Sequence, residues 1–194
     1  MIALLASFLI ATNATPRELV QSARTMIPSD VELTGRLIMR NRRGVVLEEH
    51  DYVYVRQAGV PALTIDGEPF ALSETTDDRL PTSVLGTDVT TSDISLDYLW
   101  WDDVSFDETR EGETVNGQVC AVVVLKKGDR LVRVWVDRKT GALMQAEEYE
   151  GDKAVRRLWG TRLKKFGDRW MANVMEVETL GAGHRTKITV ETLK

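Results

Sequence analysis

The sequence has few of the residues on which reactive centres are usually built. It contains one cysteine and two histidines in 194 residues. A single cysteine excludes an internal disulfide and a metal cluster built on thiolates. Cys120 lies in an apolar stretch, where a small core residue is more usual than a nucleophile. His50 and His184 are far apart in the sequence and have no ligand-type companion, so neither predicts a metal site.

The sequence motifs of common enzyme classes are also missing. There is no Gly-x-Ser-x-Gly, no phosphate-binding loop and no histidine beside a candidate nucleophile. Adjacent acids such as Glu147 and Glu148 would point to opposite faces of a strand and cannot share acid–base work. Gly86-Thr87-Asp88 is explained by a turn with a capping aspartate. We therefore expect a protein that is not an enzyme, with no catalytic residue, metal or cofactor.

The charge pattern excludes a second group of functions. The formal net charge is −5, and 28% of the residues are charged. Neither a nucleic-acid-binding surface nor a disordered acidic tail fits these values, so no nucleic-acid partner is expected. Arg40, Arg42 and Arg43 form a basic cluster near a predicted turn, and solvated charge is the simplest explanation for it.

The N-terminal segment predicts export. Residues 1–11 (MIALLASFLIA) form an apolar run of signal-peptide length that is too short to span a bilayer, and Thr12-Asn13-Ala14 offers a small-residue cleavage site. We expect a signal peptide at 1–14 and a periplasmic location, with a first buried strand or helix as the alternative. With no cysteine near the cleavage site, the protein is not expected to be a lipid-anchored lipoprotein.

An amphipathic helix and several strands follow. Thr15, Pro16 and Glu18 form a capping box with proline at the first helical position, which predicts a helix over about 16–27 that ends before Pro28. From Asp30 the apolar residues alternate with period two, which indicates strands on either side of a turn at 41–44 and two further short strands at 62–65 and 69–74.

The middle of the chain is irregular and its C-terminal part is regular. Residues 75–98 are rich in Thr, Ser and Asp and predict a surface loop or lid, in which Ser92 or Asp93 could cap a turn of helix. Strand-like sequence resumes at 98–101. From Gln118 onward, five turn-punctuated strands predict an antiparallel meander, with breaks at 128–129, 139–141, 151–152, 167–168 and 181–183.

These elements predict one domain over residues 15–194. One helix followed by roughly ten antiparallel strands gives a mainly β fold: an open or incomplete antiparallel β-barrel, or a strongly curved sheet, covered by short helices. No internal repeat or domain linker interrupts it.

The order of several segments resembles the LolA-like family of outer-membrane lipoprotein-sorting proteins, in its broader branch rather than the proteobacterial carrier. The segments are the leading helix and residues 85–94 (LGTDVTTSDI), 113–120 (ETVNGQVC), 134–141 (VWVDRKTG) and 183–188 (GHRTKI). The resemblance implies helices lying as a lid over an apolar cavity that binds acyl chains of lipoproteins or other lipids. It also implies an ABC-type lipoprotein exporter and an outer-membrane acceptor as partners of a monomeric carrier. An arginine early in the sheet latches the lid in the carrier, and Arg56 is the nearest candidate here; an ordinary strand-end charge is the alternative.

A lipid-binding wall needs apolar and adaptable side chains rather than titrating ones. The candidates for that wall are Leu19, Ala23, Met26, Leu37, Met39, Trp135, Met144, Trp159 and Met171. An ordinary core has the same methionine content, and the five tryptophans could instead form a sugar-binding face.

The main functional alternative is a non-catalytic envelope module, with the same fold and a filled core, that binds a protein partner or senses stress. A continuous apolar cavity of roughly 300 Å³ or more would favour the lipid carrier, and a packed interior would favour the module.

Overall fold

A computed structural model describes residues 14–72, 81–166 and 169–194 of the chain. The predicted signal peptide and the predicted turn at 167–168 therefore lie outside the described residues, as does part of the predicted 75–98 loop. Among the described ranges, no helix has the length and apolarity that a membrane crossing requires.

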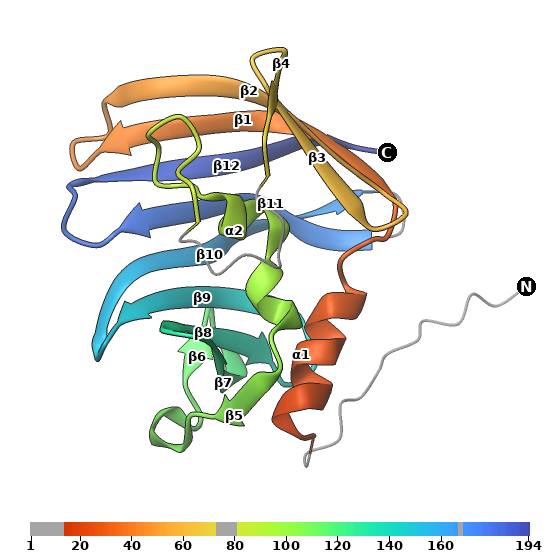
Figure 1. Cartoon of the computed structure of the whole chain (residues 1–194), viewed down its shortest axis with the longest axis vertical. Helices are drawn as coiled ribbons and strands as arrows, with labels where there is room; N and C mark the ends of the chain where they lie inside the picture. The colour runs from red at the N-terminus through yellow and green to blue at the C-terminus, as the bar shows by residue number, and fades with distance from the viewer. Residues whose placement is uncertain (1–13, 73–80, 167–168) are drawn as a thin grey trace, which may run out of the picture.

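The chain begins with one helix and continues into a single large antiparallel sheet (Figure 1). Strand order is β4-β3-β2-β1-β12-β11-β10-β9-β8-β7-β5, and β6 pairs with β7. The first half consists of α1 (Pro16–Thr25), β1 (Val31–Asn41), β2 (Val46–Gln57), β3 (Val60–Ile65), β4 (Glu68–Phe70), α2 (Thr91–Ser95), the 3₁₀ helix η1 (Asp97–Trp100), β5 (Asp103–Phe106) and the 3₁₀ helix η2 (Glu108–Arg110). The second half consists of β6 (Thr114–Val115), β7 (Gln118–Lys127), β8 (Arg130–Asp137), β9 (Leu143–Glu150), β10 (Lys153–Phe166), β11 (Arg169–Thr179) and β12 (His184–Leu193).

The sheet is open, because its first and last strands, β4 and β5, do not pair with each other in the strand order. It curves around α1 and the segment that contains α2 and η1, which lie on its concave side (Figure 1). The predicted fold, an open antiparallel sheet covered by short helices, is confirmed. The five predicted breaks separate six strands, β7 to β12, one more than expected.

Local sequence signals explain the start of α1. Thr15 Oγ1 accepts a hydrogen bond from the Glu18 backbone N–H, and the Glu18 carboxylate accepts from the Thr15 backbone N–H at 2.7 Å. The expected capping box is therefore formed, and Pro16 occupies the first helical turn.

Two local expectations in the irregular segment are wrong. The cap of α2 is Thr90 rather than Ser92 or Asp93, because Asp93 is the acidic partner that completes the capping box. Residues 98–101 are not a strand: Leu96 adopts a left-handed conformation, and η1 follows it. The backbone N–H of Leu99 bonds to the Leu96 carbonyl, so local turn bonds override the strand preference of the aromatic residues.

The sheet separates two clusters of buried side chains. On the concave side, alternate residues of the strands pack with α1 in the main core, to which β7 contributes Ala121, Val123 and Leu125. The intervening residues Cys120 and Val122 point to the opposite face, where they form a smaller cluster with Val115 and Trp135. Both faces of β7 are therefore buried.

Candidate functional site

The candidate site is the concave face of the sheet together with the elements that cover it. These elements are α1 and residues 81–101, which contain α2 and η1 and are called the cover segment below. From α1, Leu19, Val20 and Ala23 are buried in the main core. From the cover segment, five residues join the same core: Val84, Val89, Tyr98, Leu99 and Trp101. The site is thus a wall of strands with a helical and irregular cover.

The structure brings together only some of the nine predicted lipid-binding residues. Leu19, Ala23 and Leu37 meet in the main core. Met39 is buried two residues beyond Leu37 on β1, whereas Met26 follows α1 and is 52% exposed.

The other four predicted residues lie on the central strands. Trp135 is buried in the cluster on the opposite face of the sheet, and Met144 packs against that cluster. Trp159 on β10 and Met171 on β11 are half-buried. Lipid binding at any of the nine remains a prediction.

The sequence predicts the cover segment only in part. Residues 75–98 predict a surface loop or lid and residues 98–101 predict a strand, yet the segment places Tyr98, Leu99 and Trp101 in the core. The signal that could have revealed this is the capping box of Thr90 and Asp93, followed closely by a cluster of large apolar residues.

Three arginines contact the cover segment or the residue that follows it, two from α1 and one from β2. Arg17 Nη2 of α1 donates a hydrogen bond to the Asp102 carbonyl at 2.6 Å, and Arg24 Nε donates to the Leu99 carbonyl at 2.6 Å. The Arg24 guanidinium also lies 5.8 Å from the centre of the Trp100 ring. From β2, the Arg56 guanidinium lies 5.3 Å from the same ring centre. Trp100 therefore receives a cation–π contact from α1 and another from the sheet.

This arrangement bears on the predicted latch. Arg56 is half-buried, and its Nε donates to the Gly59 carbonyl at 3.3 Å, which orients the side chain at the end of its own hairpin. Its contact with Trp100 joins β2 to the cover segment. A latch role for Arg56 stays a prediction, with this contact as its geometric basis.

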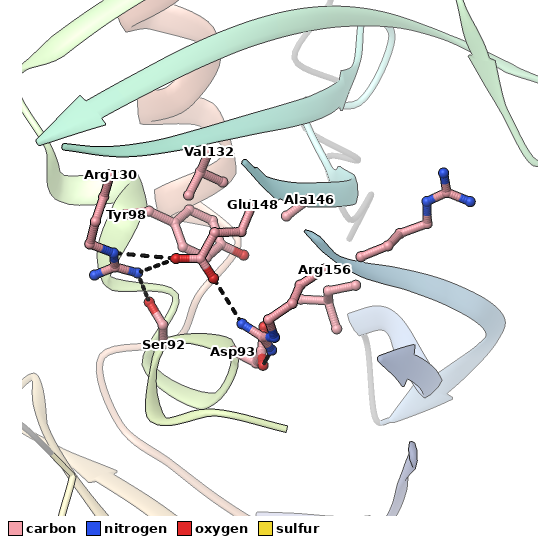
Figure 2. Close-up of a pocket in the computed structure, with 10 residues that line it drawn as sticks. Ser92, Asp93, Tyr98, Arg130, Val132, Ala146, Glu148 and Arg156 are labelled. Carbon is pink, nitrogen blue, oxygen red and sulfur yellow. Dashed lines mark hydrogen bonds and ion pairs between the residues drawn. The ribbon is translucent and has the colours of Figure 1, made fainter. Parts of the chain in front are cut away.

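A network of charged side chains fastens the cover segment to the middle of the sheet (Figure 2). Arg156 on β10 pairs with Asp93 of α2 and with Glu148 on β9, the latter at 3.0 Å. Arg130 on β8 pairs with the other oxygen of Glu148 at 3.2 Å and lies 3.7 Å from an Asp97 oxygen. The network thus joins α2 and η1 to three neighbouring strands; we call these five residues the ionic clamp.

The ionic clamp lies on the concave side. Each of its strand residues lies two positions from a core residue of the same strand, and so both point to the same face of the sheet. These pairs are Arg130 and Val132 on β8, Glu148 and Ala146 on β9, and Arg156 and Leu158 on β10. The Asp93 side chain is 8% exposed and that of Arg156 is 15% exposed. Burial raises the pKa of the Asp93 carboxyl, and the Arg156 guanidinium opposes that shift by stabilising the ionised form.

A small pocket lies beside the ionic clamp, lined by Tyr98 and Val132 as well as by the charged groups (Figure 2). Its volume is about 20 Å³, enough for about one water molecule. The buried Tyr98 hydroxyl has no hydrogen-bond partner among the described residues, so a water in this pocket would satisfy it. The pocket is far below the roughly 300–1,000 Å³ of a cavity for an acyl chain. In this conformation the cover fills the space beside the wall.

The start of the cover segment is anchored by Asp88, whose side chain is fully buried. Its carboxylate accepts hydrogen bonds from the Thr179 backbone N–H at 3.0 Å, from the Thr186 hydroxyl at 3.1 Å and from His184 Nδ1 at 3.0 Å. This aspartate therefore fixes the cover to β11 and β12. These hydrogen bonds give Asp88 a structural role.

The chain's one thiol is also structural. Cys120 is buried between Val115, Val122 and Trp135. Burial raises its pKa to about 11, which keeps the thiol protonated near neutral pH.

Comparison with known proteins agrees with this architecture. A family model described as "Uncharacterized protein" matches residues 73–194. No curated protein matches the chain. Among solved structures, a LolA superfamily protein from Nitrosomonas europaea is 13% identical, with a TM-score of 0.73 and 93% of each chain covered.

Two further solved structures share the fold. A DUF1329 family protein from Desulfovibrio piger is 17% identical, with a TM-score of 0.64 and 93% of each chain covered. A domain described as that of an outer membrane lipoprotein-sorting protein from Vibrio parahaemolyticus is 14% identical, with a TM-score of 0.64, covering 92% of this chain and 91% of that one.

Identities this low show the fold alone, whereas the family model matches more than half of the chain. The chain therefore belongs to the family that this model describes, and it shares the LolA-like fold of the solved structures.

Proposed function

We propose that the protein is a non-enzymatic carrier of the periplasm that binds an acyl chain of a lipoprotein or another lipid against the concave face of its sheet. The observation that carries the proposal is that α1 covers this face and packs against it through Leu19, Val20 and Ala23. The pocket beside the ionic clamp, with a volume of about 20 Å³, agrees with a closed form in which α1 takes the place of the ligand.

The energies of helix and ligand are comparable. Burying a Leu or Val side chain contributes about 1.5–3 kcal/mol, so the buried face of α1 contributes roughly 5 kcal/mol. About ten methylenes of an acyl chain would contribute roughly 8 kcal/mol on the same scale, less the cost of ordering the chain. An acyl chain can therefore displace the helix without a large net change in free energy, which suits a protein that must also release its ligand.

The contacts of Trp100 supply the gate in this mechanism. Because Asp88 and the ionic clamp fix the cover segment to the sheet, α1 is the part that leaves the wall. Its departure breaks the contact between Arg24 and Trp100, whose ring Arg56 contacts from β2. Arg56 is then the residue of the sheet that contributes to the latch. An ABC-type exporter as donor and an outer-membrane acceptor follow from the same proposal, and the lipoprotein-sorting description of the Vibrio parahaemolyticus domain supports them.

The proposal is tested by loosening the latch. We expect Arg56→Ala to destabilise the closed form by about 1 kcal/mol, the usual value of a cation–π contact, and so to tighten binding of a dansylated fatty acid about fivefold. Arg162→Ala, which removes an exposed arginine on β10, is the matched control and should leave the affinity unchanged. Lipid extracted from the purified protein is identified by mass spectrometry. If no lipid is recovered and the probe binds to neither wild type nor Arg56→Ala, the carrier proposal is wrong.

One observation favours a second candidate, an envelope module that binds a protein partner. Among the described residues, α1 and the cover segment pack against the concave face, as the module requires, and exposed apolar side chains occur on the outside, among them Val60 at 70% and Val119 at 51%. For such a module, Arg56→Ala would change neither lipid content nor partner affinity, whereas Val60→Ser or Val119→Ser would weaken the partner complex.

A further inference from the structure

The turn between β1 and β2 combines exposed apolar and basic side chains. Val45, Val46 and Leu47 are 56%, 44% and 48% exposed. Arg42 and Arg43, which directly precede Gly44 and Val45, are exposed as well. Residues 40–47 are called the hairpin tip below. They include no acidic residue, although the whole chain carries a formal net charge of −5.

The backbone of the hairpin tip is already hydrogen-bonded within itself. The Asn41 side-chain oxygen accepts from the backbone N–H groups of Arg43 at 2.9 Å and Val45 at 3.0 Å. The Gly44 N–H donates to the Asn41 carbonyl at 2.9 Å, and the Asn41 N–H donates to the Val45 carbonyl at 3.0 Å. Gly44 has a φ of +81°, which favours glycine at this position of the turn. The tip is therefore a preformed turn whose polar backbone loses little when water is removed from around it.

Apolar side chains beside arginines suit the boundary between lipid headgroups and acyl chains. There the apolar groups leave water and the guanidinium groups meet phosphates. We propose that the hairpin tip docks the protein on a membrane surface that contains anionic phospholipids. A folded protein partner fits less well, because three apolar side chains and two arginines are far fewer than the roughly 20–30 residues per side of a stable protein interface.

The hairpin tip lies away from α1, so docking through the tip allows ligand exchange and does not require it. In Figure 1 the turn between β1 and β2 lies on the left of the molecule, whereas α1 lies at the lower right. The surface that touches the membrane and the helix that must move are therefore separate. Docking consequently goes beyond the proposed carrier function and can be measured with no ligand added.

The test is sedimentation of the purified full chain with vesicles of phosphatidylglycerol and phosphatidylcholine in equal parts, and with vesicles of phosphatidylcholine alone. One variant carries Arg42→Ala and Arg43→Ala, and its control carries Lys139→Ala and Lys153→Ala, two exposed lysines elsewhere on the surface. A second variant carries Val45→Ser and Leu47→Ser, and its control carries Val53→Ser, farther along β2. The apolar residues 1–11 are common to all samples, so a difference between variants reports on the tip.

We expect wild type to bind the anionic vesicles and to dissociate as salt is raised. Each arginine near an anionic surface contributes a factor of about five, so loss of both should weaken partitioning roughly 30-fold. Loss of the apolar pair should weaken it about tenfold, and both controls should bind like wild type. Unchanged thermal unfolding confirms that the variants are folded.

Three results would overturn the proposal: no binding of wild type to anionic vesicles, wild-type binding by both tip variants, or an equal loss in the controls. A tip variant that changes the mass of the protein in solution would also count against it, since that result assigns the tip to contact with a second protein.

Discussion

Replacing Arg156 with methionine should destabilise the fold by leaving a buried carboxylate without its counter-ion. Arg156 contacts Asp93 and Glu148 in the ionic clamp and also donates from Nη2 to the Asp88 carbonyl at 2.9 Å. Removing one partner of a buried ion pair costs about 3–5 kcal/mol. Here Arg130 still pairs with Glu148, and Thr90 still donates its backbone N–H and hydroxyl to Asp93.

Because those contacts remain, we expect Arg156→Met to lower the free energy of unfolding by about 2–3 kcal/mol. The assay is urea denaturation followed by tryptophan fluorescence, in which this loss moves the midpoint by roughly 1 M. Arg162→Met on the same strand is the matched control, because that arginine is exposed and should change stability by less than about 0.5 kcal/mol.

The pH dependence of the loss separates charge from packing. Burial raises the pKa of the Asp93 carboxyl, and Arg156→Met removes the guanidinium whose charge opposes that shift. Because the folded-state pKa of Asp93 is raised, its protonation stabilises the fold fully below the unfolded-state pKa of about 3.9. This stabilisation is lost as pH rises through the folded-state pKa. The deficit of Arg156→Met relative to wild type should therefore be small in acid and grow toward neutral pH. In Asp93→Asn with Arg156→Met, the deficit should be smaller than the sum of the two single losses and should not grow with pH. A loss that is the same at every pH, or one within 0.5 kcal/mol of wild type, would refute the role assigned to the ionic clamp.

Three further predictions concern other parts of the chain. Gly35→Ala should lower the free energy of unfolding by about 1–3 kcal/mol, because a Cβ at this position would lie 1.7 Å from the Thr189 carbonyl oxygen on β12; thermal unfolding measures the loss, and Gly160→Ala on β10, where a Cβ would meet only the Ala172 Cβ at 3.4 Å, tests whether loss of a glycine alone explains it. The Thr109 hydroxyl and Arg133 hold the pKa of the Asp107 carboxyl below its usual range, so the stability that this group contributes is present above about pH 4 and is lost as pH falls through its folded-state pKa. Asp107→Asn should consequently flatten the acid side of the curve of melting temperature against pH, and an unchanged slope there would count against this pairing. Cys120, with a pKa near 11, should react with an aromatic disulfide reagent at pH 8 at least about a hundredfold more slowly than a free thiol until urea unfolds the chain.

The parts of the fold that the sequence predicts well are those fixed by neighbouring residues. The capping box at Thr15 and Glu18 and the turn at 41–44 are local, and both form as expected. The meander from Gln118 onward is likewise specified by turns between short alternating strands.

The cover segment is the counter-example, because its structure depends on distant partners. Nothing near Asp88 in the sequence predicts that its carboxylate will be buried against Thr179 and Thr186. Once that anchor forms, Tyr98 and Leu99 are carried into the core, and a segment with the composition of a surface loop becomes part of the interior.

The sequence predicts the positions of only some of the candidate wall residues, because others lie in strands that are apolar on both faces. Trp135 lies in a strand that is apolar on both faces, and alternation alone cannot tell which face meets α1. Leu19 and Ala23 were easier, since an amphipathic helix has only one apolar side.

The pairing of β1 with β12 has a consequence for how the protein is made. Leu33 lies opposite Leu193, and the backbone groups of Glu32 and Lys194 are hydrogen-bonded to each other, so β1, the first strand along the chain, pairs with β12. Among the described strands, β12 lies between β1 and β11 and so joins β1–β4 to the rest of the sheet. During synthesis from the N-terminal end, β1 to β4 emerge early, and one edge of β1 stays unpaired until β12 has been made. The sheet thus stays incomplete until β12 pairs, and loss of residues 184–193 would remove the strand that joins the two parts of the sheet.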